Sequence, residues 1–213
     1  MSNTHNTQQQ EQILVIRRNV LLMYPEEYFE GIKNARDCKE ILSRISGYAH
    51  FKPRNEMEQD ELFMQIIPYI ILRHKNTFFL YKRLQKAQES RLHEKYSLGI
   101  DGHINPQDES EDTLTTAALR EIKEELHLSQ QGELKLLGFL HRNREPVDKV
   151  HLGAVFLLDL PSSELSVKES GKLQAIGFLP IAEIQQHYEK LEGWSQLVLD
   201  YLKNEEESKV KTW

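Results

Sequence analysis

The sequence contains a single cysteine, Cys38, among 213 residues. One cysteine cannot form an intrachain disulfide or a cysteine zinc site, so both of these ways of stabilising a fold are excluded. This fits a reducing compartment, and we expect a cytoplasmic protein. Long apolar runs are also missing, because proline or charged residues interrupt every hydrophobic stretch. Since crossing a bilayer takes about 20 apolar residues, we expect a soluble protein without a membrane partner.

The chain also lacks an excess of positive charge. It has 27 Lys and Arg residues against 33 Asp and Glu residues, a formal net charge of -6. Proteins that wrap a phosphate backbone ordinarily carry a broad basic surface, so this balance disfavours nucleic acid as a partner. The opening residues are rich in Asn, Gln and Thr and lack both the basic start and the apolar core of a signal peptide.

The composition is that of a globular protein with one sizeable core, since 39% of the residues are hydrophobic and 28% are charged. We predict a mobile tail over residues 1–12, an N-terminal extension of a strand plus helices over 13–60, a main domain over 61–205 and a charged tail over 206–213. An extended strand in the extension offers an edge to a second subunit, so we also expect a homodimer.

Apolar spacing predicts the elements. In the extension we expect a strand at 13–16, a helix from Pro25 to Phe29, and a second helix that carries Ile41 and Ile45 and stops near Gly47. In the main domain we expect strands at 66–72, 77–81, 96–100, 134–140, 150–160 and 173–179, and helices at 112–128, from Pro180, and at 194–202. Pro68 indicates an edge position or a bulge in the first of these strands.

Three carboxylates, Glu121, Glu124 and Glu125, fall within an arc of roughly 100° on the helix expected at 112–128. Their mutual repulsion costs a few tenths of a kcal/mol per pair unless a cation neutralises it. Magnesium is the natural cation, because it binds carboxylate oxygens together with substrate phosphates. Arg120 lies one turn from Glu124 and is placed to orient it. In an acidic chain such a run is also typical of a solvated helix face, and the residues alone leave that alternative open.

Small residues surround this charged run. Gly102-His103-Ile104-Asn105-Pro106 precedes the helix, and Ala117-Ala118 lies just before Arg120. Together the segment resembles the box of the Nudix hydrolases, with matches at Gly102, Asp112, Arg120, Glu121, Ile122, Glu124, Glu125 and Leu128. The wider resemblance covers residues 61–205, including the segment Gly177-Phe178-Leu179-Pro180.

The resemblance implies an α/β fold, an α/β/α sandwich with a mixed sheet, and hydrolysis of a phosphoanhydride bond in a nucleoside diphosphate linked to another group. It implies a bound Mg²⁺, with Mn²⁺ as the alternative, held by Glu121, Glu124, Glu125 and a carbonyl near Gly102. The family takes its catalytic base from different places, so Glu125, Glu145 and Glu169 are all candidates.

Several basic side chains are candidates for binding the substrate, because guanidinium groups match phosphate oxygens. We select Arg83, His103 and Arg142, and most other basic residues are expected to be ordinary surface charge. The further candidates are Arg91, His93, His141 and Arg144.

The chain departs from the family pattern at four places. The segment between Gly102 and Arg120 is about four residues longer, with the insertion expected at 107–111. Asp112 replaces a glutamate and is expected to cap the helix. His127 replaces the glycine that closes the box, which puts the geometry of the helix end in doubt, and Asp101 replaces a second glycine.

Two other functions remain open. A non-catalytic module would keep the fold and bind a nucleotide or a protein. The isopentenyl diphosphate isomerase branch of the fold needs a cysteine just before the glycine loop, where this chain has Gly99, Ile100 and Asp101.

Overall fold

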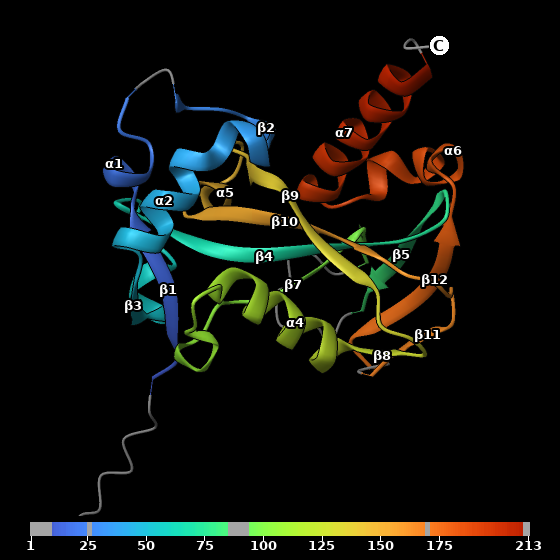
Figure 1. The fold of residues 1–213 in the computed structure, drawn as a ribbon, viewed down its shortest axis with the longest axis horizontal. Coiled ribbons are helices and arrows are strands. Elements are labelled where there is room, and N and C mark those ends of the chain that lie inside the picture. Colours follow the sequence, from blue (N-terminus) through green and yellow to red (C-terminus); the bar gives the residue numbers. More distant parts are fainter. Residues whose placement is uncertain (1–9, 25–26, 85–93, 169–170, 211–213) are drawn as a thin grey trace, which may run out of the picture.

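The computed structural model describes residues 10–24, 27–84, 94–168 and 171–210. They form a mixed sheet with helices on both faces (Figure 1), so the predicted α/β sandwich is confirmed. No helix within these ranges is both long enough and apolar enough to cross a membrane.

The sheet is built around two central strands, β4 (Phe63–His74) and β10 (His151–Asp159). They run parallel, with Leu152 opposite Ile66, whereas their other neighbours pair antiparallel. Both are buried along most of their length, as runs of branched apolar residues predict. The strand order is β12-β5-β4-β10-β9-β2, where the remaining strands are β12 (Leu173–Leu179), β5 (Thr77–Arg83), β9 (Glu133–His141) and β2 (Gly31–Asn34).

Short strands complete the other side of β4. β1 (Gln12–Arg17) pairs with its first residues and β7 (Gly99–Asp101) pairs with Tyr69–Ile71. Pro68 lies between these two pairings, where no neighbouring strand requires its missing N–H group. β4 is therefore a central strand, and Pro68 lies at the gap between the two short strands that pair along this side of it. The other short strands are β3 (His50–Pro53), beside β1, and β6 (Tyr96–Ser97), beside β5.

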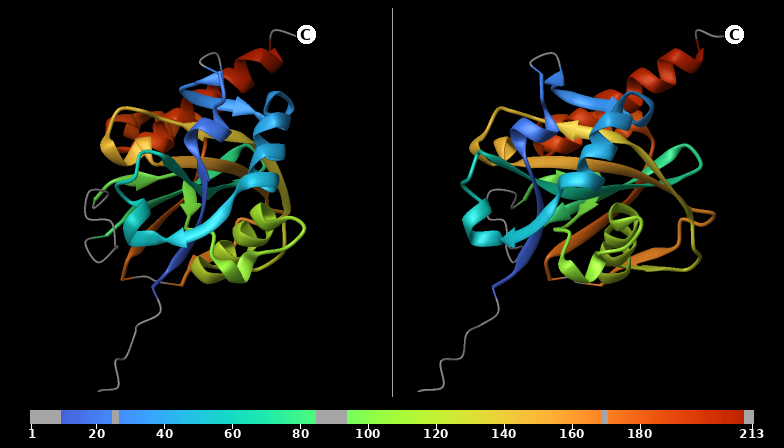
Figure 2. Two further views of the ribbon diagram at one scale, coloured as in Figure 1. Left: turned by 90° about the vertical axis from the view of Figure 1, so that its left-hand side faces the viewer. Right: turned by 60° about the vertical axis from the view of Figure 1, so that its left-hand side comes forward.

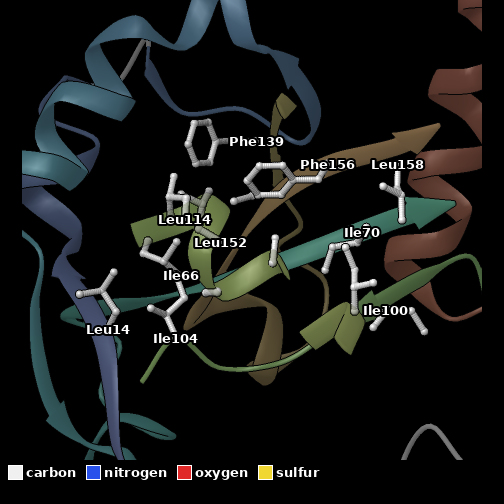
Figure 3. Close-up of a cluster of buried hydrophobic side chains, with 14 of the residues drawn as sticks. Leu14, Ile66, Ile70, Ile100, Ile104, Leu114, Phe139, Leu152, Phe156 and Leu158 are labelled. Atoms are coloured by element: carbon white, nitrogen blue, oxygen red, sulfur yellow. The ribbon is translucent and has the colours of Figure 1, made fainter. Parts of the chain in front are cut away.

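Helices cover both faces of the sheet. α4 (Thr113–Glu125) lies on one face, and α6 (Ile181–Ile184) and α7 (Gly193–Val210) lie on the other (Figures 1 and 2). Leu114 of α4 packs in one cluster with Ile66, Ile70 and Phe156 of the sheet (Figure 3). α2 (Lys39–Tyr48) adds to this cluster, while α7 contributes to a second one around Tyr69. The shorter helices are α1 (Arg18–Leu21), α3 (Arg54–Met57) and α5 (Pro146–Lys149), with 3₁₀ turns at Ala35–Cys38, Pro106–Asp108 and Gln185–Lys190.

The sequence predicts the start of α4 correctly but not its end. Asp112 caps the start, since its Oδ1 accepts a hydrogen bond from the backbone N–H of Thr115 at 3.2 Å. The predicted end near Leu128 is wrong: the helix stops at Glu125, because Leu126–Leu128 form the strand β8, which pairs with β11 (Leu165–Val167). His127 is thus extended, and no left-handed backbone is needed where the family has glycine.

The N-terminal extension is an integral part of the sheet. The predicted strand and the helix α2 are confirmed, although α2 runs through Gly47 to Tyr48. Pro25 lies outside the described residues, and residues 27–30 contain no α-helix. β1 pairs with β3 along one part and with β4 along another, so the edge that motivated the expected dimer is covered. Dimerisation itself stays a prediction. The final helix continues to Val210, past the predicted end at Leu202.

A bidentate ion pair joins α2 to the segment that follows α1. Arg44 donates to both carboxylate oxygens of Glu27, at 2.8 and 2.7 Å, and to the carbonyl of Leu21 at 2.9 Å. These hydrogen bonds lower the pKa of Glu27 from 4.5 to about 2. The folded state therefore holds this carboxylate ionised at a pH where the unfolded chain protonates it, so the stabilisation is present above pH 4.5 and is lost as the pH falls toward 2.

Glu27→Gln is therefore expected to lower the free energy of unfolding by about 1 kcal/mol at pH 7. The difference from wild type should shrink below pH 4.5 and be lost as the pH falls through about 2, where the Glu27 carboxylate of the folded protein takes up a proton. Urea denaturation at several pH values measures it. A difference that stays constant over this range would show that the ion pair is not its source.

Candidate active site

A cleft of about 410 Å³ lies beside the central strands β4 and β10, which contribute Ile67 and His151 to its wall. Its walls come from the glycine loop after β7, from α4, from the start of β10 and from the start of α7. Each predicted metal ligand, Gly102, Glu121, Glu124 and Glu125, lines this cleft. The acidic helix face is therefore turned into a concave site.

Gly102 is in close contact with Glu121. A Cβ atom at position 102 would overlap the Glu121 carboxylate group, lying 2.5 Å from Oε2 and closer to its other atoms. Only glycine fits here, because any side chain would push the carboxylate away. The loop can therefore approach Glu121 this closely only because residue 102 has no side chain.

Glu121 is buried, with 7% of its surface exposed. Burial raises its pKa to about 7, against the opposing effect of Arg120, whose Nη1 lies 2.7 Å from Glu121 Oε1. The same guanidinium donates to Glu124 at 2.8 Å and to the carbonyl of His103 at 2.8 Å. Arg120 therefore fixes the glycine loop against the acidic face of the helix.

The acid that binds Arg120 most fully is Asp108, a residue that the sequence does not single out. Its two carboxylate oxygens accept from Nε and Nη2 of Arg120 at 2.8 and 2.9 Å. Asp108 also accepts from the backbone N–H of Asn105 at 2.9 Å, which closes a tight turn. Asp112, which we aligned with the glutamate of the family pattern, only caps the helix. Asp108, and not Asp112, is therefore the acid of this loop that holds Arg120.

The three predicted ligands are not gathered into a ready metal site. Within the ranges that the structure describes, no three His, Cys, Asp or Glu side chains form a group that could hold a metal ion. Glu124 lines the cleft but contacts Arg120 instead of the other two acids, and 55% of its side chain is exposed. The residues nevertheless fit a divalent cation, since a buried carboxylate with a raised pKa gains from a nearby positive charge and since carboxylate oxygens are the ligands that magnesium prefers.

A second charged group lies deeper in the cleft, around Arg83. Its Nη2 donates to Asp101 at 2.6 Å, and its Nε lies 3.6 Å from Glu192. Asp101 also contributes to the raised pKa of Glu121, so the two groups interact electrostatically. The side chain of Asp101 therefore turns to Arg83 and does not crowd the loop.

Glu192 was missed by the sequence prediction. It precedes α7, is 5% exposed and lines the cleft. Its Oε1 accepts from Tyr69 at 2.9 Å, from Ser97 at 2.5 Å and from Ser195 at 3.1 Å, and burial raises its pKa. Three separate elements, β4, β6 and α7, bring these hydroxyl groups to Glu192, so no local pattern in the sequence could reveal them.

The predicted substrate-binding residues all line the cleft: Arg83, His103 and Arg142. Burial and, to a smaller extent, the nearby charge of Arg54 lower the pKa of His103 to about 3, so this imidazole is neutral. Arg142 pairs with Asp148 at 3.0 Å and rests against Gly193. The part of these three residues in binding substrate stays a prediction.

The candidate bases are placed differently. Glu125 lines the cleft, whereas Glu145 pairs with Arg142 at 3.1 Å and is not part of the cleft wall. Glu169 lies outside the described residues, as do Arg91 and His93. Two further basic candidates are engaged elsewhere: His141 is buried against the carbonyl of Phe29, and Arg144 pairs with Glu30.

Comparison with known proteins points in the same direction. Residues 67–201 match the family model described as the NUDIX domain. Protein YmaB of Bacillus subtilis (strain 168) is 33% identical over 201 residues, covering 90% of this chain and 97% of YmaB.

Solved structures show the same fold. The crystal structure of Tm1382, described as a proposed Nudix hydrolase, superposes with a TM-score of 0.75 and 29% identity, covering 91% of this chain and 99% of Tm1382. The NUDIX domain of Shewanella oneidensis NrtR, solved with ADP ribose, shares the fold with a TM-score of 0.51 and 10% identity, covering 66% of this chain and 86% of that domain.

Proposed function

Since the chain belongs to the Nudix family, we propose that it is a divalent-metal-dependent hydrolase that cleaves a phosphoanhydride bond in a nucleoside diphosphate linked to another group. The observation that carries this proposal is the close contact of Gly102 with Glu121 in the cleft wall that also holds Glu124 and Glu125.

Glu121, Glu124 and Glu125, with the carbonyl of Gly102, would hold Mg²⁺ or Mn²⁺. Such a cation would polarise a phosphoryl oxygen of the substrate and make a water molecule more acidic. Arg120 positions the glycine loop and the helix relative to each other through its contacts with Asp108 and His103. Its contact with Glu124 is the one that metal binding would exchange.

Proton transfer needs a base on the cleft wall. Of the predicted bases, Glu125 is the one that both lies in the described ranges and lines the cleft, so we propose it as the first to test. Glu145 would have to leave Arg142 before it could reach substrate.

Membership of the family and the mixed charge of the cleft support the proposed substrate class. Arg83, His103 and Arg142 offer donors for phosphate oxygens beside the acidic wall that would hold the metal. A neutral His103 can hydrogen-bond without adding charge. The ADP ribose bound by the NrtR domain is one member of the class that we propose.

The test is a panel of nucleotide sugars, ADP-ribose, dinucleoside polyphosphates and nucleoside triphosphates, each assayed with Mg²⁺, with Mn²⁺ and with EDTA. We expect hydrolysis of at least one compound with either metal and loss of that activity in EDTA. Absence of metal-dependent turnover on every compound would favour the non-catalytic module. Isopentenyl diphosphate belongs in the panel as well, and isomerisation without hydrolysis would contradict the proposal.

A further inference from the structure

The N-terminal segment that precedes residue 67 lies outside the match to the family model, yet the alignments with YmaB and Tm1382 each span about nine-tenths of the chain. In the structure this segment touches the glycine loop. The backbone N–H of Leu14 donates to the carbonyl of Ile104 at 2.9 Å, and the side chain of Asn105 donates to the carbonyl of Gln12 at 2.9 Å. β1 therefore runs beside the loop that precedes α4 (Figure 1).

Two residues of the segment, Glu11 and Arg54, line the cleft itself. The backbone N–H of Arg54 donates to the carbonyl of Glu11 at 2.8 Å, and its guanidinium donates through Nη1 to Glu11 at 3.0 Å and through Nε to Glu58 at 3.1 Å. These contacts fix the guanidinium plane. No described residue accepts a hydrogen bond from its Nη2, so donors remain for a ligand.

The two acids that hold Arg54 are more exposed to solvent than Arg54 itself. The side chains of Glu11 and Glu58 are 45% and 54% exposed, whereas that of Arg54 is 24% exposed. Water and salt therefore screen the charges of these two carboxylates more strongly than the charge of the guanidinium.

The neighbour of Arg54 in the cleft is His103, and hydrogen bonds determine its tautomer. Gln65 donates through Nε2 to the carbonyl of Met57 at 3.1 Å, so its Oε1 faces His103 Nε2 at 2.9 Å as an acceptor. Nε2 of His103 therefore carries the proton, and Nδ1 is an acceptor. This end of the cleft thus combines one fixed cation with a neutral imidazole.

We propose that Arg54 binds phosphate oxygens of the substrate, so that the N-terminal segment forms part of the active site. This inference rests on the proposed function and adds to it a residue from outside the family match. The phosphate oxygens belong either to the diphosphate that is cleaved or to a further phosphate of the substrate, and a guanidinium group binds both in the same way.

Steady-state kinetics of Arg54→Ala and Arg54→Lys, with Mg²⁺ and each panel compound that the wild type hydrolyses, tests the proposal. For Arg54→Ala we expect KM to rise about tenfold while kcat stays within about twofold, because binding is lost more than chemistry. Arg54→Lys should fall between the alanine variant and wild type, since it keeps the charge but not the planar fork. Lys52→Ala is the matched control, because Lys52 is two residues away, lies over the Phe63 ring at 4.9 Å and does not line the cleft.

The panel separates the two sources of phosphate. A rise in KM for every substrate assigns Arg54 to the diphosphate, and a rise confined to nucleoside triphosphates and dinucleoside polyphosphates assigns it to a further phosphate. An unchanged KM for all of them, even with a lowered melting temperature, would overturn the proposal and leave the hydrolase assignment standing.

Calorimetric titration with tripolyphosphate and Mg²⁺ tests the inference without turnover. Wild type is expected to bind, and Arg54→Ala to bind about tenfold more weakly. Equal affinity of the two proteins, or no binding by wild type, would overturn the role of Arg54.

Discussion

Glu124→Gln is expected to lower kcat by about 100- to 1,000-fold while the melting temperature changes little. The side chain of Glu124 is 55% exposed and contacts Arg120, so the fold depends on it weakly. Chemistry depends on it strongly, because an amide is a poor ligand for a hard cation compared with a carboxylate. Assays at saturating Mg²⁺, together with thermal denaturation, measure both quantities.

Glu40→Gln is the matched control for this experiment. Glu40 pairs with Arg44 four residues along α2, as Arg120 pairs with Glu124 four residues along α4, and its side chain is 78% exposed. It lies outside the cleft wall, so kcat should match wild type. Equal activity of Glu124→Gln and Glu40→Gln would count against the proposed metal site.

Gly102→Ala is expected to reduce activity by about 100-fold or more, because the added methyl group occupies the place of the Glu121 carboxylate. The backbone of Gly102 does not have a positive φ, so alanine suits the local conformation and the effect is steric. Displacement of Glu121 would move one ligand away from the others. The measurement is kcat/KM with Mg²⁺, with circular dichroism to check the fold.

Gly47→Ala provides the comparison. A Cβ at position 47, inside α2, meets no atom within 4 Å, so alanine should leave activity unchanged and raise helix stability by about 0.5–1 kcal/mol. If Gly102→Ala behaved in the same way, the close contact of loop and helix would have no part in catalysis.

The sequence predicts the acidic face of α4 well, because that face depends on local periodicity. Leu114 and Ile122 lie on the buried side of the helix, and Asp112 caps it as expected. The end of the helix depends on a distant segment, since Leu126–Leu128 leave it to pair with Leu165–Val167. Local signals cannot reveal that competition between helix and strand.

The partner of Arg120 illustrates a second limit. Asp112 matches the family spacing when counted back from the helix, but Asp108 is the acid that the turn brings to the guanidinium. The 3₁₀ turn at Pro106–Asp108 and the residues after it make the difference, and where a loop takes up extra length is decided by its tertiary contacts.

Residues from distant elements complete the cleft. Arg54, from the N-terminal segment, and Glu192, before the last helix, both line it, and neither belongs to a recognisable motif. In the sequence Glu192 is one acidic residue among many, and only the folded structure shows that three hydroxyl groups surround it. The sequence therefore predicts the part of the cleft wall that α4 provides better than the residues that distant elements bring to it.

The most direct test of the account is a titration with Mn²⁺, in which the electron paramagnetic resonance signal of the free ion measures how much is bound. Manganese shares the preference of magnesium for carboxylate oxygens and is visible spectroscopically. We expect wild type to bind Mn²⁺ and the Glu121→Gln, Glu124→Gln and Glu125→Gln variants to bind it about tenfold or more weakly. Mn²⁺ affinity that is the same in wild type and all three variants would contradict the assignment of these carboxylates as metal ligands.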